Sequence, residues 1–248
     1  PVSLTIGAAT TVNDLMTLIN NTLGIESTSG DPSIPVPNDG GTGTAPGVTI
    51  SGGRIQVVGN SGSVNNFSMS VGDFLAGGSP VPLQFTKSQE ADGESTGTDF
   101  IVYDSLGQAV KMRLTATLES RSSGQTQFRY YIESTDDARP DIAIANGIIT
   151  FNGLGEVSAG GKATFSLDRS NTAAVSPMQI NIDFNQLSGI LAANAPSQLG
   201  LKTQDGAAPG TLQSFVVDES GVINGVFDNG LTRTLGQVIL ARFANSDG

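Results

Sequence analysis

The chain has 248 residues, no cysteine and no histidine, and its 23 acidic against 12 basic residues give a net charge of −11. These numbers exclude disulfides, thiolate metal sites, nucleophiles activated by histidine, and the basic surface that nucleic-acid binding requires. No apolar run is long enough to cross a membrane, and the length exceeds that of one typical domain. Frequent glycine (32) and proline (11) with only 14% charged residues are typical of short strands joined by turns. The sequence therefore predicts a mainly β fold of two to three small β-rich domains, sandwich-like or barrel-like, with one α+β unit near the N-terminus.

Residues 1–95 are predicted to form that α+β unit. A strand is expected at Val2–Ile6, followed by a helix that Thr11 caps, with Asp14 placed for a capping box and Gly24 as the stop. The glycine-rich stretch 40–44 lacks the lysine of a phosphate-binding loop, so no cofactor is expected there. Short strands are expected at 48–51, 54–58 and 66–70, and the acidic stretch 89–99 is expected to be a solvated connector.

A second unit opens with the strand Asp99–Tyr103 and the turn Asp104–Gly107. In the strand 110–118 apolar side chains at even positions alternate with polar side chains at odd positions, and residues 127–133 repeat this pattern. Further strands are expected at 147–151, 163–167 and 178–184. Strands at this spacing, with turn residues between them, favour a sandwich or a barrel.

Residues 211–243 are predicted to form a β-meander of three strands and two tight turns. The first turn is Asp218–Gly221, where the aspartate can bond to its own backbone and the glycine tolerates positive φ. The second contains Asn229-Gly230, the residue pair that favours a primed two-residue turn. The middle strand is expected at Val222–Phe227 and the last at Gly236–Phe243.

The same stretch resembles the C-terminal segment of the bacterial flagellar hook protein family and its axial relatives. In that segment an Asp-x-x-Gly turn, a Gly-x-(Tyr/Phe)-x-Asn-Gly turn and a Leu-Gly-Gln-(Val/Ile)-x-Leu-Ala-x-Phe strand follow one another. Residues 102–107, VYDSLG, resemble the segment that opens the outer domain of hook proteins. The resemblance implies structural, non-catalytic roles for the matching residues Asp104, Gly107, Asp218, Gly221, Gly225, Asn229, Gly230, Leu235, Gly236 and Gln237.

The resemblance also implies a function and a division into domains. The expected function is that of a structural subunit of the hook, a curved, self-assembling tube that passes motor torque to the filament as a universal joint. The implied domains are a variable outer insertion domain (1–95), the hook outer β-domain (96–192) and the C-terminal β-segment of the inner domain (193–248).

The resemblance further implies an extracellular location in the flagellum. The implied partners are other copies of the chain in a helical assembly, together with rod and hook–filament junction proteins; nucleic acid and membrane are not expected, nor is any metal. The terminal helices of hook proteins have no counterpart here. The chain is therefore expected to be a fragment that lacks the helical core and stays monomeric.

Two other interpretations stay open: an extracellular β-module that binds carbohydrate or a cell surface, and a rod subunit of the same axial family. Carbohydrate sites use exposed aromatic rings, and the chain has no tryptophan and only Tyr103, Tyr130 and Tyr131. An enzyme is not expected, because the carboxylates lie mostly in turn contexts where a structural role is sufficient.

Overall fold

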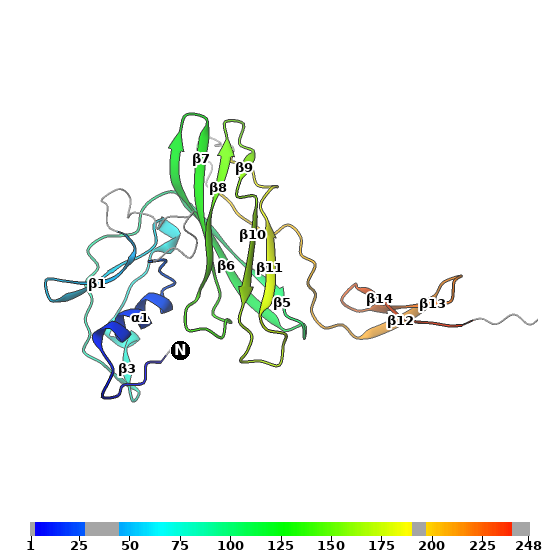
Figure 1. The fold of residues 1–248 in the computed structure, drawn as a ribbon, viewed down its shortest axis with the longest axis horizontal. Coiled ribbons are helices and arrows are strands. Elements are labelled where there is room, and N and C mark those ends of the chain that lie inside the picture. Colours follow the sequence, from blue (N-terminus) through cyan, green and yellow to red (C-terminus); the bar gives the residue numbers. More distant parts are fainter. Residues whose placement is uncertain (1–2, 28–44, 190–196, 240–248) are drawn as a thin grey trace, which may run out of the picture. The chain divides into compact units, whose positions relative to one another are not determined.

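The computed structural model describes residues 3–27, 45–189 and 197–239, which are mainly β with a short helix near the N-terminus (Figure 1). This confirms the predicted fold class. No helix in these ranges is long and apolar enough to span a bilayer. The elements are α1 (Val12–Thr22), β1 (Gly47–Ser51), β2 (Arg54–Val58), the 3-10 turns η1 (Ser63–Asn65) and η2 (Val71–Asp73), β3 (Leu75–Ala76), β4 (Ser79–Pro80), β5 (Ser95–Tyr103), β6 (Ala109–Ser122), β7 (Gln125–Glu133), β8 (Ala143–Asn152), β9 (Val157–Ala159), β10 (Lys162–Leu167), β11 (Met178–Asp183), β12 (Leu212–Val217), β13 (Val222–Phe227) and β14 (Thr232–Gln237).

Helix α1 begins where its capping residues predict. The Asp14 N–H donates to Thr11 Oγ1 at 3.4 Å, and the Thr11 N–H donates to Asp14 Oδ2 at 2.7 Å, which completes a capping box. The hydrogen bonds from the backbone and side chain of Thr11 lower the pKa of Asp14. The strand predicted at Val2–Ile6 is wrong for its described residues 3–6, because no neighbouring strand pairs with them.

The first hairpin is confirmed, but two other predictions in this region are wrong. Strands β1 and β2 pair antiparallel around a turn at residues 52–53. No strand forms at 66–70, where the Asn66 side chain instead donates to Glu90 at 2.7 Å and accepts from Lys87 at 2.7 Å. The predicted connector 89–99 is too long, because β5 already starts at Ser95. The glycine-rich stretch 40–44 lies outside the described residues.

The main sheet has the strand order β5-β6-β7-β8-β9. Cross-strand pairs such as Leu114↔Ile132 and Phe128↔Ile149 put the alternating apolar side chains on one face. The β10–β11 hairpin lies against this face, where the Phe184 ring centroid is 5.1 Å from that of Tyr130 (Figure 1). The buried apolar side chains of the main sheet and the β10–β11 segment include Leu114, Ala116, Tyr130, Ile132, Ile149, Phe151, Phe165, Leu167, Ile180 and Phe184.

The opposite face of the main sheet, here called the polar face, carries Thr115, Thr117, Arg129 and Tyr131, and none of these residues is more than 1% exposed. It is buried because the N-terminal layer, defined as the described residues 3–27 and 45–65, lies on it. Arg113 Nη2 donates to the Val64 carbonyl at 3.1 Å, and a Cβ on Gly62 would lie 2.4 Å from Thr117 Cγ2. The alternating pattern predicts which residues share this face, but not that a second layer covers it.

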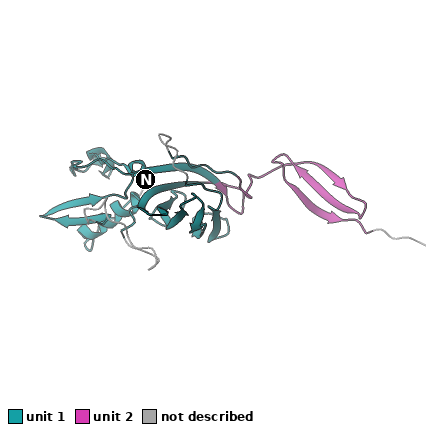
Figure 2. Cartoon of the chain, turned by 90° about the horizontal axis from the view of Figure 1, so that it is seen from above, with its two compact units in different colours: residues 1–101, 111–202 teal, residues 102–110, 203–248 magenta. Residues whose placement is uncertain are grey.

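The chain divides into two compact units, residues 1–101 with 111–202 and residues 102–110 with 203–248 (Figure 2). The second unit contains an antiparallel sheet of order β12-β13-β14, as the predicted meander requires. The prediction for the last strand is wrong, because β14 starts at Thr232, opposite Val226, where pairing follows directly from the preceding turn. Residues 240–243 of the predicted strand lie outside the described part.

Candidate functional site

The turn that begins with Asp218 is closed by its own side chain. Asp218 Oδ1 accepts from the N–H of Ser220 at 2.9 Å and from the N–H of Val222 at 3.0 Å. The Gly221 N–H donates to the Asp218 carbonyl at 3.0 Å, and Gly221 has a φ of 80°. This is a type I turn followed by a left-handed glycine, a common three-residue hairpin loop. Hydrogen bonds from the Ser220 side chain and the Val222 backbone lower the pKa of Asp218.

The same turn occurs at residues 104–108. Asp104 Oδ1 accepts from the N–H of Leu106 at 2.9 Å and of Gln108 at 3.0 Å, and Gly107 has a φ of 75°. Gly107 also lies against Pro209, where an added Cβ would come within 2.7 Å of the ring. Asp104 and Gly107 are therefore paired in one turn, as are Asp218 and Gly221.

A third copy of the turn, at residues 152–156, is not among the predicted site residues. Asn152 Oδ1 accepts from the N–H of Leu154 at 2.9 Å and of Glu156 at 3.0 Å, and Gly155 has a φ of 78°. The signal that could have found it is the spacing itself, because an Asn or Asp stands three residues before a glycine in all three turns.

The turn at Asn229 and Gly230 has the same loop length, although its first residue is Phe227. The Gly230 N–H donates to the Phe227 carbonyl at 3.1 Å, and the Phe227 N–H donates to the Leu231 carbonyl at 2.9 Å. The predicted hairpin is present, but the predicted two-residue primed turn is wrong. Asn229 links the turn to the preceding segment, because its Nδ2 donates to the Ala208 carbonyl at 2.7 Å.

The sheet β12-β13-β14 has one apolar face, here called the open apolar face. Cross-strand pairing places Leu212 with Phe227, and Val217 with Ile223, on this face. Gly225 lies at its centre, where a Cβ would be 2.7 Å from Leu212 Cδ1 and 2.8 Å from Leu235 Cδ1. Four of its members are exposed, namely Leu212, Phe215 (64%), Val217 and Leu235, whereas Ile223 and Phe227 are half-buried. Within the described residues, this face is a sheet surface without a cover.

Two predicted residues remain at the end of β14. Gln237 Nε2 donates to the Ser220 carbonyl at 3.0 Å and so ties β14 to the Asp218 turn. A Cβ added to Gly236 would meet no heavy atom within 4 Å, and nothing in the structure explains a glycine there. The ten predicted residues thus lie in turns and in the sheet β12-β13-β14, and the part they play in assembly remains a prediction.

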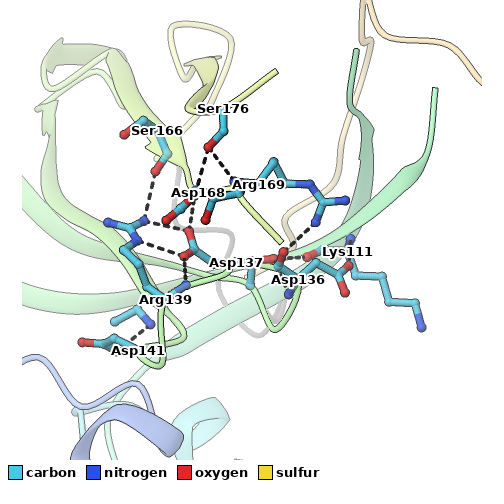
Figure 3. A network of polar contacts seen from close by, with 12 residues as sticks. Lys111, Asp136, Asp137, Arg139, Asp141, Ser166, Asp168, Arg169 and Ser176 are labelled. Carbon is cyan, nitrogen blue, oxygen red and sulfur yellow. Dashed lines mark hydrogen bonds and ion pairs between the residues drawn. The ribbon is translucent and has the colours of Figure 1, made fainter. Parts of the chain in front are cut away.

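A polar network that is not among the predicted features joins the β7–β8 connection to the β10–β11 connection (Figure 3). The Asp137 side chain is 0% exposed and accepts from Arg139 Nη2 at 2.8 Å and from the Asp168 N–H at 3.0 Å. Arg169 Nη1 donates to the Asp136 carbonyl at 2.6 Å. No sequence pattern pairs these loops, because the residues that meet are far apart in the chain.

None of this geometry resembles a reaction centre. The described residues include no group of three or more carboxylates, histidines or cysteines that could hold a metal ion. The polar groups instead close turns, link loops or pair strands.

Residues 75–207, more than half of the chain, match the family model described as the flagellar basal body protein FlaE D2 domain. The chain belongs to the flagellar hook protein family. This is a family of structural, non-enzymatic proteins, so the expectation that the chain is not an enzyme is confirmed.

Curated relatives agree with this membership. The chain is 27% identical over 170 residues to the flagellar hook protein FlgE of Salmonella typhimurium, which covers 68% of the chain and 40% of the relative. It is 30% identical over 182 residues to the FlgE of Helicobacter pylori strain 26695, covering 69% of the chain and 24% of the relative. A crystal structure of Helicobacter pylori FlgE2 aligns with a TM-score of 0.39 at 18% identity, covering 62% of the chain and 34% of that structure. The hook-family chain thus spans less than half the length of these relatives.

Proposed function

We propose that this chain is part of a structural subunit of the bacterial flagellar hook, which self-assembles into a curved tube and transmits motor torque to the filament. The supporting observation is the open apolar face of β12-β13-β14, in a chain whose residues 75–207 match the hook D2 family. An exposed apolar sheet face is typical of a surface that is covered by another segment or another molecule. Its location would be the flagellum outside the cell.

The domain division belongs to the same proposal. Residues 96–192 act as the outer β-domain, and residues 193–248 supply the C-terminal β-segment of an inner domain. The open apolar face supports the second assignment, because a segment that is half of a domain leaves its core side uncovered. Residues 1–95 act as an outer insertion, of which residues 1–74 lie outside the family match.

The positions of the three tyrosines do not favour the carbohydrate-binding alternative. Tyr130 and Tyr131 are both buried in the main sheet, on its apolar face and its polar face respectively. Tyr103 is half-buried. The tyrosines therefore offer no exposed stacking platform for a sugar.

The test uses the full-length protein that contains this chain, produced in a bacterium whose own hook gene has been deleted. We expect hooks in electron micrographs and swimming in soft agar. In the same background Phe215→Ser, on the open apolar face, should reduce the number of hooks and the swimming distance. Val216→Ser, on the opposite face of β12, should reduce these two quantities less. Absence of hooks with the unchanged protein, despite its normal secretion, would contradict the proposal, and rescue of a rod-gene deletion instead would favour the rod subunit.

A further inference from the structure

The contact between the N-terminal layer and the polar face contains more carboxyl groups than cationic groups. Gly24, just after α1, lies against Glu133, whose Oε1 is 3.0 Å from the position of an added Cβ. The Ile142 N–H donates to the Asn21 carbonyl at 3.2 Å, which places the end of α1 on the β7–β8 connection. The titratable groups at this contact are the carboxyls of Glu26, Asp99, Glu119, Glu133 and Asp141, the phenol of Tyr131 and the guanidiniums of Arg113, Arg129 and Arg139.

The Arg129 guanidinium forms an ion pair with Glu119. Arg129 Nε and Nη2 donate to the two carboxylate oxygens of Glu119, both at 2.8 Å, and the Arg129 side chain is 1% exposed. Burial lowers the pKa of Arg129, but the hydrogen bond and charge of Glu119 outweigh it and raise that pKa. A bidentate pair of this kind neutralises Glu119 first. Each of the remaining half-buried carboxyls has one guanidinium that lowers its pKa, namely Arg129 for Glu26, Arg113 for Glu133 and Arg139 for Asp141.

Glu26, Glu133 and Asp141 are half-buried, whereas Asp99 is exposed. Burial is the largest cause and raises the pKa of Glu26 and of Glu133. Repulsion from Asp141 adds to both rises and repulsion from Glu26 adds to that of Glu133, whereas the Asn146 hydrogen bond and Arg129 at Glu26, and Arg113 at Glu133, oppose the rise without cancelling it. Burial also raises the pKa of Asp141. The Ala143 backbone hydrogen bond and the charge of Arg139 lower this pKa, and the charge of Asp137 raises it. The carboxyls lie near the last turn of α1, where the helix dipole is negative and disfavours anions.

We propose that the N-terminal layer is a proton-sensitive cover, held on the polar face by a contact that tightens when Glu26, Glu133 and Asp141 take up protons. When the layer opens, water reaches these groups and they bind protons less tightly. Each group with a raised native pKa therefore contributes stabilisation that is complete below the ordinary carboxyl pKa of about 4. This stabilisation is lost as the pH rises through the raised native value, so alkaline conditions loosen the cover.

Amide hydrogen exchange of the whole chain measures the opening directly. The Ile142 amide is bonded across the contact to Asn21, and the Phe184 amide, bonded to the Gly161 carbonyl at 2.8 Å on the far side of the main sheet, is the internal reference. Exchange is corrected for the intrinsic effect of pH. Between about pH 5 and about pH 8, we expect the protection of Ile142 relative to Phe184 to fall by at least about threefold.

Neutral variants separate this mechanism from a general effect of pH. Glu26→Gln and Glu133→Gln keep the size of the side chain, and each should raise the protection of Ile142 at about pH 8 and flatten its pH dependence. Glu219→Gln, the same change on an exposed turn, should leave both unchanged. The proposal is wrong if Ile142 and Phe184 change in parallel, or if both interface variants keep the pH dependence of the unchanged chain.

Discussion

Glycines with positive φ close the hairpin turns at Gly221 and Gly230, and the two positions differ in the space available for an added Cβ. Gly221 has a φ of 80° and Gly230 a φ of 79°. A Cβ on Gly221 would lie 2.7 Å from the Val238 carbonyl oxygen, whereas a Cβ on Gly230 would meet nothing within 4 Å. The two positions therefore share the backbone cost of a substitution but not the steric one.

Gly221→Ala should destabilise the second unit more than Gly230→Ala does. The backbone cost of alanine at positive φ is about 1 kcal/mol at both sites, and the clash with Val238 adds to it only at Gly221. Urea unfolding followed on amide signals of β13 measures the difference. Equal losses of stability would mean that β14 moves away freely and that the Val238 N–H bond to the Gly221 carbonyl contributes little.

Asp137 supports the first unit through its charge. Burial raises its pKa, but the hydrogen bonds from Arg139 and from the Asp168 backbone outweigh this and lower it. A carboxyl with a lowered native pKa contributes stability that is present above its ordinary pKa of about 4 and is lost as the pH falls through the native value.

Asp137→Asn should therefore cost about 2 to 3 kcal/mol near neutral pH, because it leaves Arg139 and the buried loop without the carboxylate. It should also reduce the loss of stability in acid. Urea unfolding at several pH values measures both effects. Asp205→Asn, which replaces an exposed carboxylate, is the control and should change neither the stability near neutral pH nor its loss in acid. If Asp137→Asn loses as much stability in acid as the unchanged chain does, the stabilising role of the Asp137 charge is contradicted.

At the scale of elements, neighbouring residues of β12 lie on opposite faces with nearly equal exposure. Phe215 is 64% exposed on the open apolar face, and Val216 is 59% exposed on the other, where its cross-strand partner is Asn224. Exposure alone does not distinguish them. Their neighbours do, because Phe215 pairs with Gly225, around which Leu212 and Leu235 lie, although Arg233 pairs with Gly225 from the other side.

Phe215→Ser in the purified chain should lower the fluorescence of a dye that binds apolar surfaces and raise solubility, because it interrupts the largest apolar area of this sheet. Val216→Ser should have a smaller effect on both. The hydrogen-exchange protection of β13 should stay the same in the two variants, since neither side chain is buried. Equal dye binding in both variants would show that the open apolar face is not a continuous surface.

The sequence predicts local features of these elements better than their partners. The capping box of α1, the turns at Asp104 and Asp218 and the alternation in β6 follow from residues close together in the chain, and the structure contains them. The prediction of a strand fails where the strand would need a pairing partner that is distant in the chain, as at residues 66–70. The network around Asp137 and the ion pair of Arg129 could not be predicted, because no short-range pattern joins their members.

At the scale of the whole molecule, the first unit is a sheet covered on both faces by different kinds of chemistry. The β10–β11 hairpin covers the apolar face through residues such as Phe184, and the N-terminal layer covers the polar face through carboxylates, guanidiniums and hydroxyls. Family membership accounts for residues 75–207, and the N-terminal layer lies outside that range.

A sheet face made of charged and hydroxyl side chains stays compatible with water when it is bare. Removing residues 3–65 would therefore expose mainly arginine, threonine and glutamate side chains, with Tyr131 as the main aromatic among them, and the β10–β11 hairpin would still cover the apolar face. A relative that lacks the N-terminal layer would therefore present a largely polar sheet surface to water.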